Sequence, residues 1–117
     1  MSDHRKLDVW KLSIELVVEI YEITKKFPKE EIYGLTSQIR RCAISIPSNI
    51  AEGSARQSDR ELIQFLYMAL GSLSELETQL IIAKKLSYIS TVETLSDKID
   101  SVKKLLMGLI KYLKNKK

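Results

Sequence analysis

The stretch SDRELIQFLYMALGSLSELETQLIIAKK, residues 58–85, decides the fold of this chain. Its apolar residues alternate steps of four and three without a miss: Leu62, Leu66, Ala69, Leu73, Leu76, Leu80 and Ala83. That spacing puts all seven on one stripe of an α-helix, in the pattern of a heptad seam. Ser58 and Glu61 have the Ser-x-x-Glu form of an N-terminal capping box. The stretch therefore predicts a long helix that packs against other helices through one side.

The sequence before it predicts two more helices, at about 6–27 and 33–54. The first has two neighbouring apolar rows, which are Trp10, Ile14, Val17 and Tyr21, and Val9, Leu12, Leu16, Ile20, Ile23 and Phe27. Because this face is wider than one helix contact needs, the helix is expected to lie centrally or to meet another subunit as well. Pro28 ends it, since a proline disfavours helix at the residue before it.

The helix at 33–54 has an inner stripe of Leu35, Ile39, Cys42, Ile46 and Ile50. Pro47 lies inside this pattern and has no amide proton, so the Ala43 carbonyl loses its helical partner and a kink is expected. Asn49 stands nearby as a donor for the freed carbonyl. Gly53 is expected to stop the helix.

The last helix is predicted at about 90–114, with a second capping box at Ser90 and Glu93. Its stripe is Leu95, Ile99, Val102, Leu106, Leu109 and Leu113. The four segments are joined by short connections, and such links make neighbouring helices antiparallel. The 117 residues hold only two prolines and four glycines. We therefore expect one domain, 1–117, of the all-α class: an antiparallel up-down-up-down four-helix bundle with a kinked second helix.

Residue types argue against an enzyme. The only histidine is His4, and the only cysteine, Cys42, falls on an inner stripe and is expected to be a core thiol. No Glu-x-x-His pair, zinc spacing or glycine-rich phosphate loop is present, so neither a metal nor a cofactor is predicted. The first residues do not resemble a signal peptide, and no apolar run has the length of a membrane helix. These features predict a cytoplasmic protein.

Two polar patterns leave functional questions open. After Asp100 come Lys103, Lys104, Lys111, Lys114, Lys116 and Lys117 and no acidic residue, in a chain of net charge +4. These lysines complement the helix dipole or attract nucleic acid. Polar residues also recur at helical spacing, as Arg41, Ser45, Asn49, Glu52 and Arg56, and as Gln64, Ser72, Glu75 and Gln79. Such stripes are either solvated faces or a subunit contact or ligand groove; Glu52 and Arg56 are spaced to pair.

The run Ser45-Ile-Pro47-Ser-Asn49-Ile-Ala-Glu52-Gly53 resembles the hallmark of the bacterial 23S ribosomal RNA intervening-sequence proteins. The segment from Gly71 to Leu80, with Ser72 and Glu75, and the early Leu7-Asp-Val-Trp10 are similarly typical. Members are four-helix bundles similar to the accessory variability protein of diversity-generating retroelements, a basic, barrel-like pentamer that contacts nucleic acid. The resemblance therefore implies a homo-pentamer and places Pro47, Asn49, Glu52, Gly53, Ser72 and Glu75 in its motif or interface.

Two hypotheses follow. The first is a non-enzymatic homo-oligomer that binds RNA or other nucleic acid through Arg40, Arg41, Arg56, Arg60, Lys111 and Lys114. Its binding would be mainly electrostatic and would weaken with salt. The alternative is a protein-binding scaffold or adaptor without a nucleic-acid role. The two differ in whether the arginines cluster on an exposed surface or are consumed in ion pairs.

Overall fold

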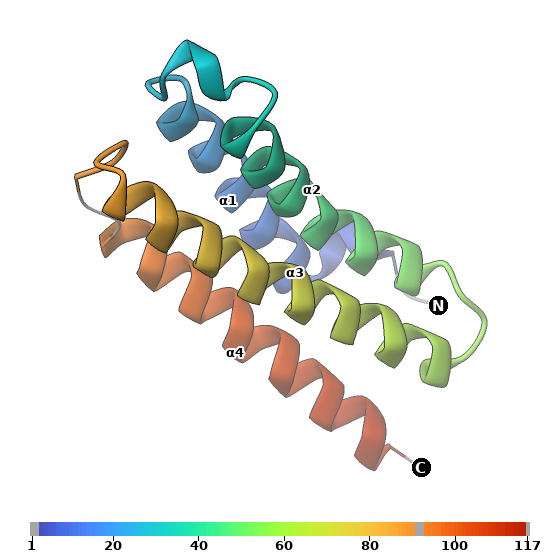
Figure 1. Cartoon of the computed structure of the whole chain (residues 1–117). Coiled ribbons are helices and arrows are strands. Elements are labelled where there is room, and N and C mark those ends of the chain that lie inside the picture. Colours follow the sequence, from blue (N-terminus) through green and yellow to red (C-terminus); the bar gives the residue numbers. More distant parts are fainter. Residues whose placement is uncertain (1–2, 91–92, 117) are drawn as a thin grey trace.

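The computed structural model describes residues 3–90 and 93–116 (Figure 1). Four α-helices dominate it: α1 (Asp8–Thr24), α2 (Leu35–Ser54), α3 (Asp59–Lys85) and α4 (Glu93–Asn115). Two short 3-10 helices, η1 (His4–Lys6) and η2 (Lys29–Glu31), precede α1 and α2. No strand occurs among the described residues, so the predicted all-α class is confirmed.

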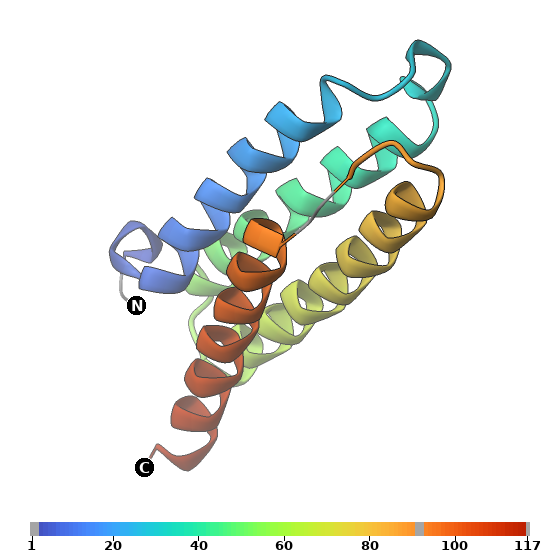
Figure 2. The same ribbon diagram turned by 90° about the vertical axis from the view of Figure 1, so that its left-hand side faces the viewer.

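The helices form an elongated bundle of 49 × 24 × 20 Å. The chain reverses direction at each connection, so that α1 and α3 run one way and α2 and α4 the other (Figure 1). Each helix contacts its neighbours in the order α1–α2–α3–α4, and α4 returns to α1. Figure 2 shows α4 inclined to the other three helices, so the space between α3 and α4 differs from that between α2 and α3.

The seam of α3 is the centre of the core, as its spacing predicts. All seven seam residues, from Leu62 to Ala83, are buried. At its start the Ser58 hydroxyl accepts a hydrogen bond from the Glu61 amide at 3.2 Å, which confirms that half of the predicted capping box. The corresponding box at Ser90 involves the side chain of Glu93, which lies outside the described side chains.

Three details of α1 and α4 differ from the predictions. Helix α1 ends at Thr24 rather than Phe27, whose amide closes a tight turn onto the Thr24 carbonyl. Helix α4 begins at residue 93 rather than 90. In α4 the core position is taken by buried Ile110, and Leu109 is only half-buried. Successive residues of a helix are turned by about 100°, so the core stripe of α4 shifts by one residue at this turn, while Leu106 and Leu113 on either side are buried as predicted.

The two rows of α1 have different environments. Val9, Leu16, Ile20 and Phe27 of the second row are buried in the core. The residues of the first row are half-buried or, at Ile14, exposed. The wide apolar face of α1 therefore extends beyond what one chain covers.

The second helix continues through Pro47, which is buried. The kink expected at this proline stays a prediction. Gly53 is not the predicted stop: α2 continues to Ser54, and Gly53 lies buried against α3. A Cβ at this position would lie 2.7 Å from the Phe65 Cβ and 2.9 Å from the Leu62 Cδ1. This glycine is therefore required by close helix packing and not by a turn.

A candidate binding groove between two polar stripes

The polar stripes of α2 and α3 face each other along the contact between these helices. The Ser45 hydroxyl donates to the Cys42 carbonyl at 2.6 Å, and its oxygen lies 2.6 Å from the Ser72 Oγ. The two hydroxyls therefore form a chain in which Ser72 donates to Ser45. Small side chains at these positions allow the two backbones to approach closely.

Cys42 is part of this contact. Its thiol lies 2.9 Å from the Ser72 carbonyl oxygen and 3.7 Å from the Glu75 Oε1, so its single proton has two acceptors within reach. Burial, together with the negative charge and hydrogen bond of Glu75, raises the pKa of the Cys42 thiol to about 12. The thiol thus stays protonated near neutral pH, which argues against a nucleophile. Cys42 lies in the core, as its place on the inner stripe predicts.

Beside this contact the two helices border an open polar groove of about 610 Å³. Arg41 and Ser37 line it from α2, and Glu75 and Gln79 from α3. Tyr33, which is 95% exposed, lines it from the residues before α2. We call this feature the α2–α3 groove. The groove lies between the two polar stripes. They therefore meet in one surface feature and are not two separate faces that only water contacts.

Gln79 is the least expected member of the groove. The residue is only 7% exposed, and its Oε1 is buried without a hydrogen-bond partner among the described residues. Leaving a buried acceptor unpaired costs about 1–3 kcal/mol. Arg41 also forms no ion pair among the described residues, although Glu75 lines the same groove. The α2–α3 groove therefore holds a hydrogen-bond donor, Arg41, and an acceptor, the Gln79 Oε1, for which the described residues supply no partner.

The other residues of the family-like motif have structural partners. The Asn49 amide donates to the Ser45 carbonyl at 2.8 Å, and not to the Ala43 carbonyl that Pro47 frees, so that expectation was wrong. The predicted pair of Glu52 and Arg56 is present, with 2.9 Å between the Glu52 Oε2 and the Arg56 Nη2. Within the motif, Ser45 and Gly53 therefore contact α3, whereas Asn49 and Glu52 bond within α2 and its C-terminal end.

The four arginines do not form one cluster within the chain. Arg40 donates to the Thr24 Oγ1 at 2.8 Å and stacks over the Tyr21 ring at 4.6 Å. Arg41 is exposed next to it. Arg56, by contrast, is paired with Glu52, and Arg60 is exposed at the start of α3. Arg41 lies about 20 Å along the helix axis from the end of α2 at Ser54, at 1.5 Å per residue, and Arg56 lies beyond that end.

The C-terminal lysines are also divided. The Lys114 ammonium donates to the Tyr67 hydroxyl at 2.7 Å and lies 5.0 Å from the centre of that ring. Lys116 is 3.1 Å from Asp59, and Lys103 is 3.6 Å from Glu77. Lys111 is exposed. Helix α4 is thus held against α3 by several of the lysines whose role the sequence left open.

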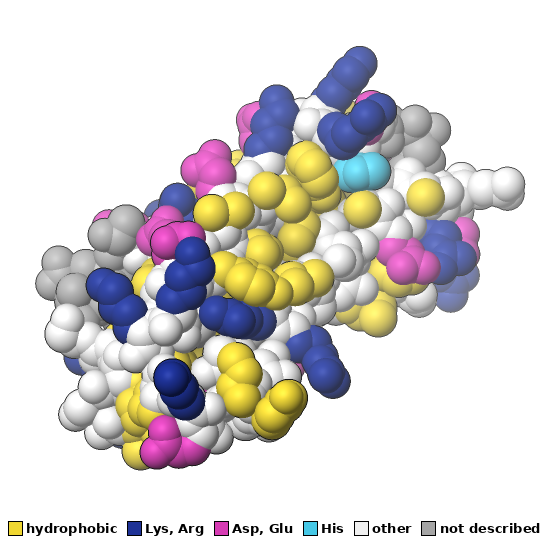
Figure 3. Space-filling model, turned by 90° about the horizontal axis from the view of Figure 1, so that it is seen from above, with side chains coloured by type: hydrophobic (Ala, Val, Ile, Leu, Met, Phe, Trp, Pro, Cys, Tyr) yellow, Lys and Arg dark blue, Asp and Glu magenta, His cyan; other side chains and the backbone are white. Residues whose placement is uncertain are grey.

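An apolar patch covers the outer side of α1 and α2. Figure 3 shows hydrophobic side chains gathered beside His4, with lysine and arginine side chains around them. His4 itself packs edge-on against Trp10, with 5.2 Å between the ring centres. The large apolar side chains that α1 and α2 expose are Ile14, Val18 and Ile44. We call these residues, with Trp10, the α1–α2 patch.

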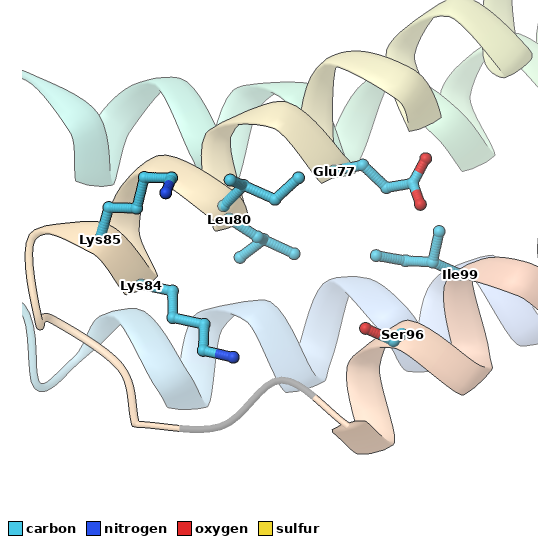
Figure 4. Close-up of a pocket in the computed structure, with 7 residues that line it drawn as sticks. Glu77, Leu80, Lys84, Lys85, Ser96 and Ile99 are labelled. Atoms are coloured by element: carbon cyan, nitrogen blue, oxygen red, sulfur yellow. The ribbon is translucent and has the colours of Figure 1, made fainter.

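Between α3 and α4 the surface is hollowed and mostly apolar. One hollow of about 510 Å³ is lined by Leu80, Ile81 and Ile99, and another of about 550 Å³ by Tyr67, Leu70 and Met107. In Figure 4, Leu80 on α3 and Ile99 on α4 point into the space between the helices, with Lys84 beside them. A Cβ at Gly108, which lines the second hollow, would meet nothing within 4 Å.

Sequence reasoning missed part of the α2–α3 groove. Ser37 lies four residues before Arg41, so extending the polar stripe by one helical step would have found it. Tyr33 gave no such signal, because its position depends on how the chain enters α2. Among the described residues no group of three His, Cys, Asp or Glu side chains could hold a metal ion. None of the helices there is long and apolar enough to cross a membrane.

Fold and site together define a small four-helix bundle with a polar groove and without a recognisable catalytic group among the described residues. The family model described as 23S rRNA-intervening sequence protein matches residues 5–108, and the chain belongs to that family. A search of curated protein sequences finds no significant match.

Proposed function

We propose that this protein is a non-enzymatic, cytoplasmic homo-oligomer that binds RNA or other nucleic acid through the exposed face of α2. The observation that carries the proposal is the state of Arg40 and Arg41. Arg40 is held by a hydroxyl and a ring and not by a carboxylate, so its position is fixed while its charge stays available. Arg41 is exposed beside it without an ion pair among the described residues.

An arginine placed in this way suits phosphate recognition. Its planar guanidinium offers several donors, and fixing the side chain in advance lowers the entropy that binding must overcome. Arg56 is a weaker candidate because Glu52 already neutralises it. Arg60 and Lys111 are also exposed, but they lie apart from this pair, at the start of α3 and on α4. The family description, which refers to an rRNA intervening sequence, agrees with this direction without naming a ligand.

Self-association is the second part of the proposal. The α1–α2 patch and the apolar hollows between α3 and α4 lie on different sides of the bundle, since α1 and α2 adjoin on one side and α3 and α4 on the other. Two unlike apolar surfaces favour a head-to-tail contact, which closes into a ring when the rotation fits. A ring would bring Arg40 and Arg41 of several copies together. The pentamer implied by the resemblance is the size we propose.

The protein-scaffold function remains the second candidate. It is favoured by the size of the exposed apolar surface, which includes Met68, Ile81 and Met107 on α3 and α4. Exposed apolar surface of this kind is typical of protein contacts. If the oligomer leaves these residues uncovered, a different protein is the better occupant.

The experiment is a fluorescence-anisotropy titration of labelled structured RNA and duplex DNA at low and physiological salt. The test variant is Arg40→Gln with Arg41→Gln. The matched control is Arg56→Gln with Lys116→Gln, which also removes two positive charges, each of them already paired with a carboxylate. We expect tight, salt-dependent binding that the test variant loses and the control keeps. Equal binding by both variants, or none by the wild type, would contradict the nucleic-acid function and favour the scaffold.

A further inference from the structure

The α2–α3 groove contains three polar groups with capacity left over. Glu75 has one long contact, with the Cys42 thiol at 3.7 Å. The Gln79 Oε1 has no partner among the described residues. Arg41 lines the same groove and forms no ion pair there. The groove thus offers a guanidinium as donor and, on the facing helix, a carboxylate and a carboxamide.

These groups define the ligand that would fit them. A carboxylate accepts hydrogen bonds only, and it is best matched by two adjacent N–H donors. The arginine needs an acceptor on the same ligand. A terminal amide turns easily about its last torsion, so Gln79 can present either its carbonyl or its NH₂ to the groove. The complementary ligand therefore carries an acceptor beside two neighbouring donors on one flat edge.

Among the four RNA bases only guanine has that edge, with O6 as acceptor and N1–H and N2–H as adjacent donors. Adenine, cytosine and uracil do not place two different N–H donors side by side. We propose that the α2–α3 groove binds a guanine base, with N1–H and one N2–H donating to the Glu75 carboxylate, the other N2–H donating to the Gln79 carbonyl, and O6 accepting from Arg41. Proteins read unpaired bases in RNA by this combination of edge hydrogen bonds and stacking.

Tyr33 supplies the stacking surface. It lines the groove and is 95% exposed, so its ring has no partner within the chain that would have to be displaced. An exposed aromatic ring beside hydrogen-bonding groups is the arrangement on which flipped-out bases stack. The volume of about 610 Å³ is large enough for a ligand of this size class.

Guanine can come from an unpaired nucleotide in RNA or from a free guanine nucleotide. Glu75 and Gln79 cannot distinguish these sources, because both present the same edge. The RNA source rests on the proposed function, whereas the free nucleotide does not. The two are therefore separated by using both as probes.

The test uses the full chain and fluorescein-labelled oligouridylate with three central guanosines, beside the same strand carrying inosine. Inosine lacks only the N2 amino group. We expect the wild type to bind the guanosine strand on the order of tenfold more tightly than the inosine strand. Glu75→Gln should abolish this preference. The matched control is Glu77→Gln, which removes the same charge two residues along α3, where the carboxylate lies 3.6 Å from Lys103 and not in the groove.

Gln79→Leu provides a second variant with a signature that a folding defect cannot imitate. Replacing the unpaired buried amide by an apolar side chain of similar size should raise the melting temperature while the guanosine preference is lost. Free GMP, added as a competitor and titrated directly, is the second probe. Competition by GMP but not by IMP or AMP would assign the same site to the free base.

The outcomes separate this inference from the proposed function. Salt-dependent RNA binding with equal affinity for guanosine and inosine strands would overturn the guanine site and leave the proposed function standing. Binding of GMP without binding of RNA would support the guanine site and contradict the proposed function. No binding of either probe would overturn both. If Glu75→Gln changes the size of the oligomer but not the guanosine preference, the groove is a subunit contact and the inference is wrong.

Discussion

The two contacts that α3 makes with its sequence neighbours are built in opposite ways. On the side of α2, Ser72 of α3 hydrogen-bonds with Ser45, and Gly53 of α2 has no side chain, which lets the two helices approach closely. Towards α4 it presents larger apolar side chains, and the inclined α4 leaves hollows between them (Figures 2 and 4). The first contact is joined by hydrogen bonds between the helices and leaves a polar groove beside them. The second leaves apolar surface for another molecule.

The largest effect is expected from a substitution in the α3 seam, because the seam lies at the centre of the core. Leu73→Asp buries a charge at a position with no exposed surface. We expect it to reduce the free energy of unfolding by about 4 kcal/mol or more, enough to unfold many small domains. Circular dichroism during thermal melting measures the loss. An unchanged melting curve would contradict the assignment of the α3 seam.

A pair of glycine substitutions compares the two contacts directly. Gly53→Ala places a Cβ 2.7 Å from the Phe65 Cβ and should lower the free energy of unfolding by about 1–3 kcal/mol. Gly108→Ala places its Cβ in open space and should raise it by about 1 kcal/mol, because alanine favours a helix over glycine.

Chemical denaturation of the two variants provides the measurement. Equal shifts of the same sign would show that the contacts are packed alike. If Gly108→Ala stabilises the monomer but weakens self-association, Gly108 is a site of close approach by another copy.

The thiol of Cys42 tests how closed the α2–α3 contact is. Because the pKa of this thiol is raised in the folded state to about 12, its contribution to stability is complete below the unfolded pKa near 9 and is lost between these values. At pH 10 the free energy of unfolding should have fallen by about 1 kcal/mol from this group. Denaturation at pH 8 and 10 measures the change, with Cys42→Ala as the reference that lacks it. Parallel losses in both proteins would mean that the thiol is not enclosed.

The smallest effect concerns the turn after α3. Ser87 has a φ of 64°, and the next amide, of Tyr88, donates to the Ala83 carbonyl at 2.9 Å. This left-handed position is strained for serine and suits glycine. Ser87→Gly should therefore stabilise the fold by about 0.5 kcal/mol, after the added flexibility of the unfolded chain is subtracted. Ser90→Gly, outside the left-handed turn, is the control and should not stabilise.

The helices could be predicted from sequence because each depends on its own apolar spacing. The seam from Leu62 to Ala83 is the clearest case, and only the helix ends and the step from Leu109 to Ile110 were misplaced. The α2–α3 groove could be predicted only in part. Its stripes are visible in sequence, but their meeting depends on which way two helices are rotated. The unpaired Gln79 carbonyl and the entry of Tyr33 arise from tertiary packing alone.

The role of Gly53 shows the same limit. Near the end of a predicted helix, a glycine indicates a helix stop because its backbone is unusually free to leave the helical conformation. The local sequence does not show how close another helix lies. Its actual role, close packing against Leu62 and Phe65, requires knowing that α3 returns beside it.

The central claim is that the α2 face and the groove it shares with α3 form the binding surface. Hydrogen–deuterium exchange with and without guanosine-containing RNA tests this most directly, because it reports every peptide at once. We predict slower exchange confined to residues 33–45 and 72–79, with α4 unchanged. Protection only along α1 and α4, or none at saturating RNA, would contradict the claim.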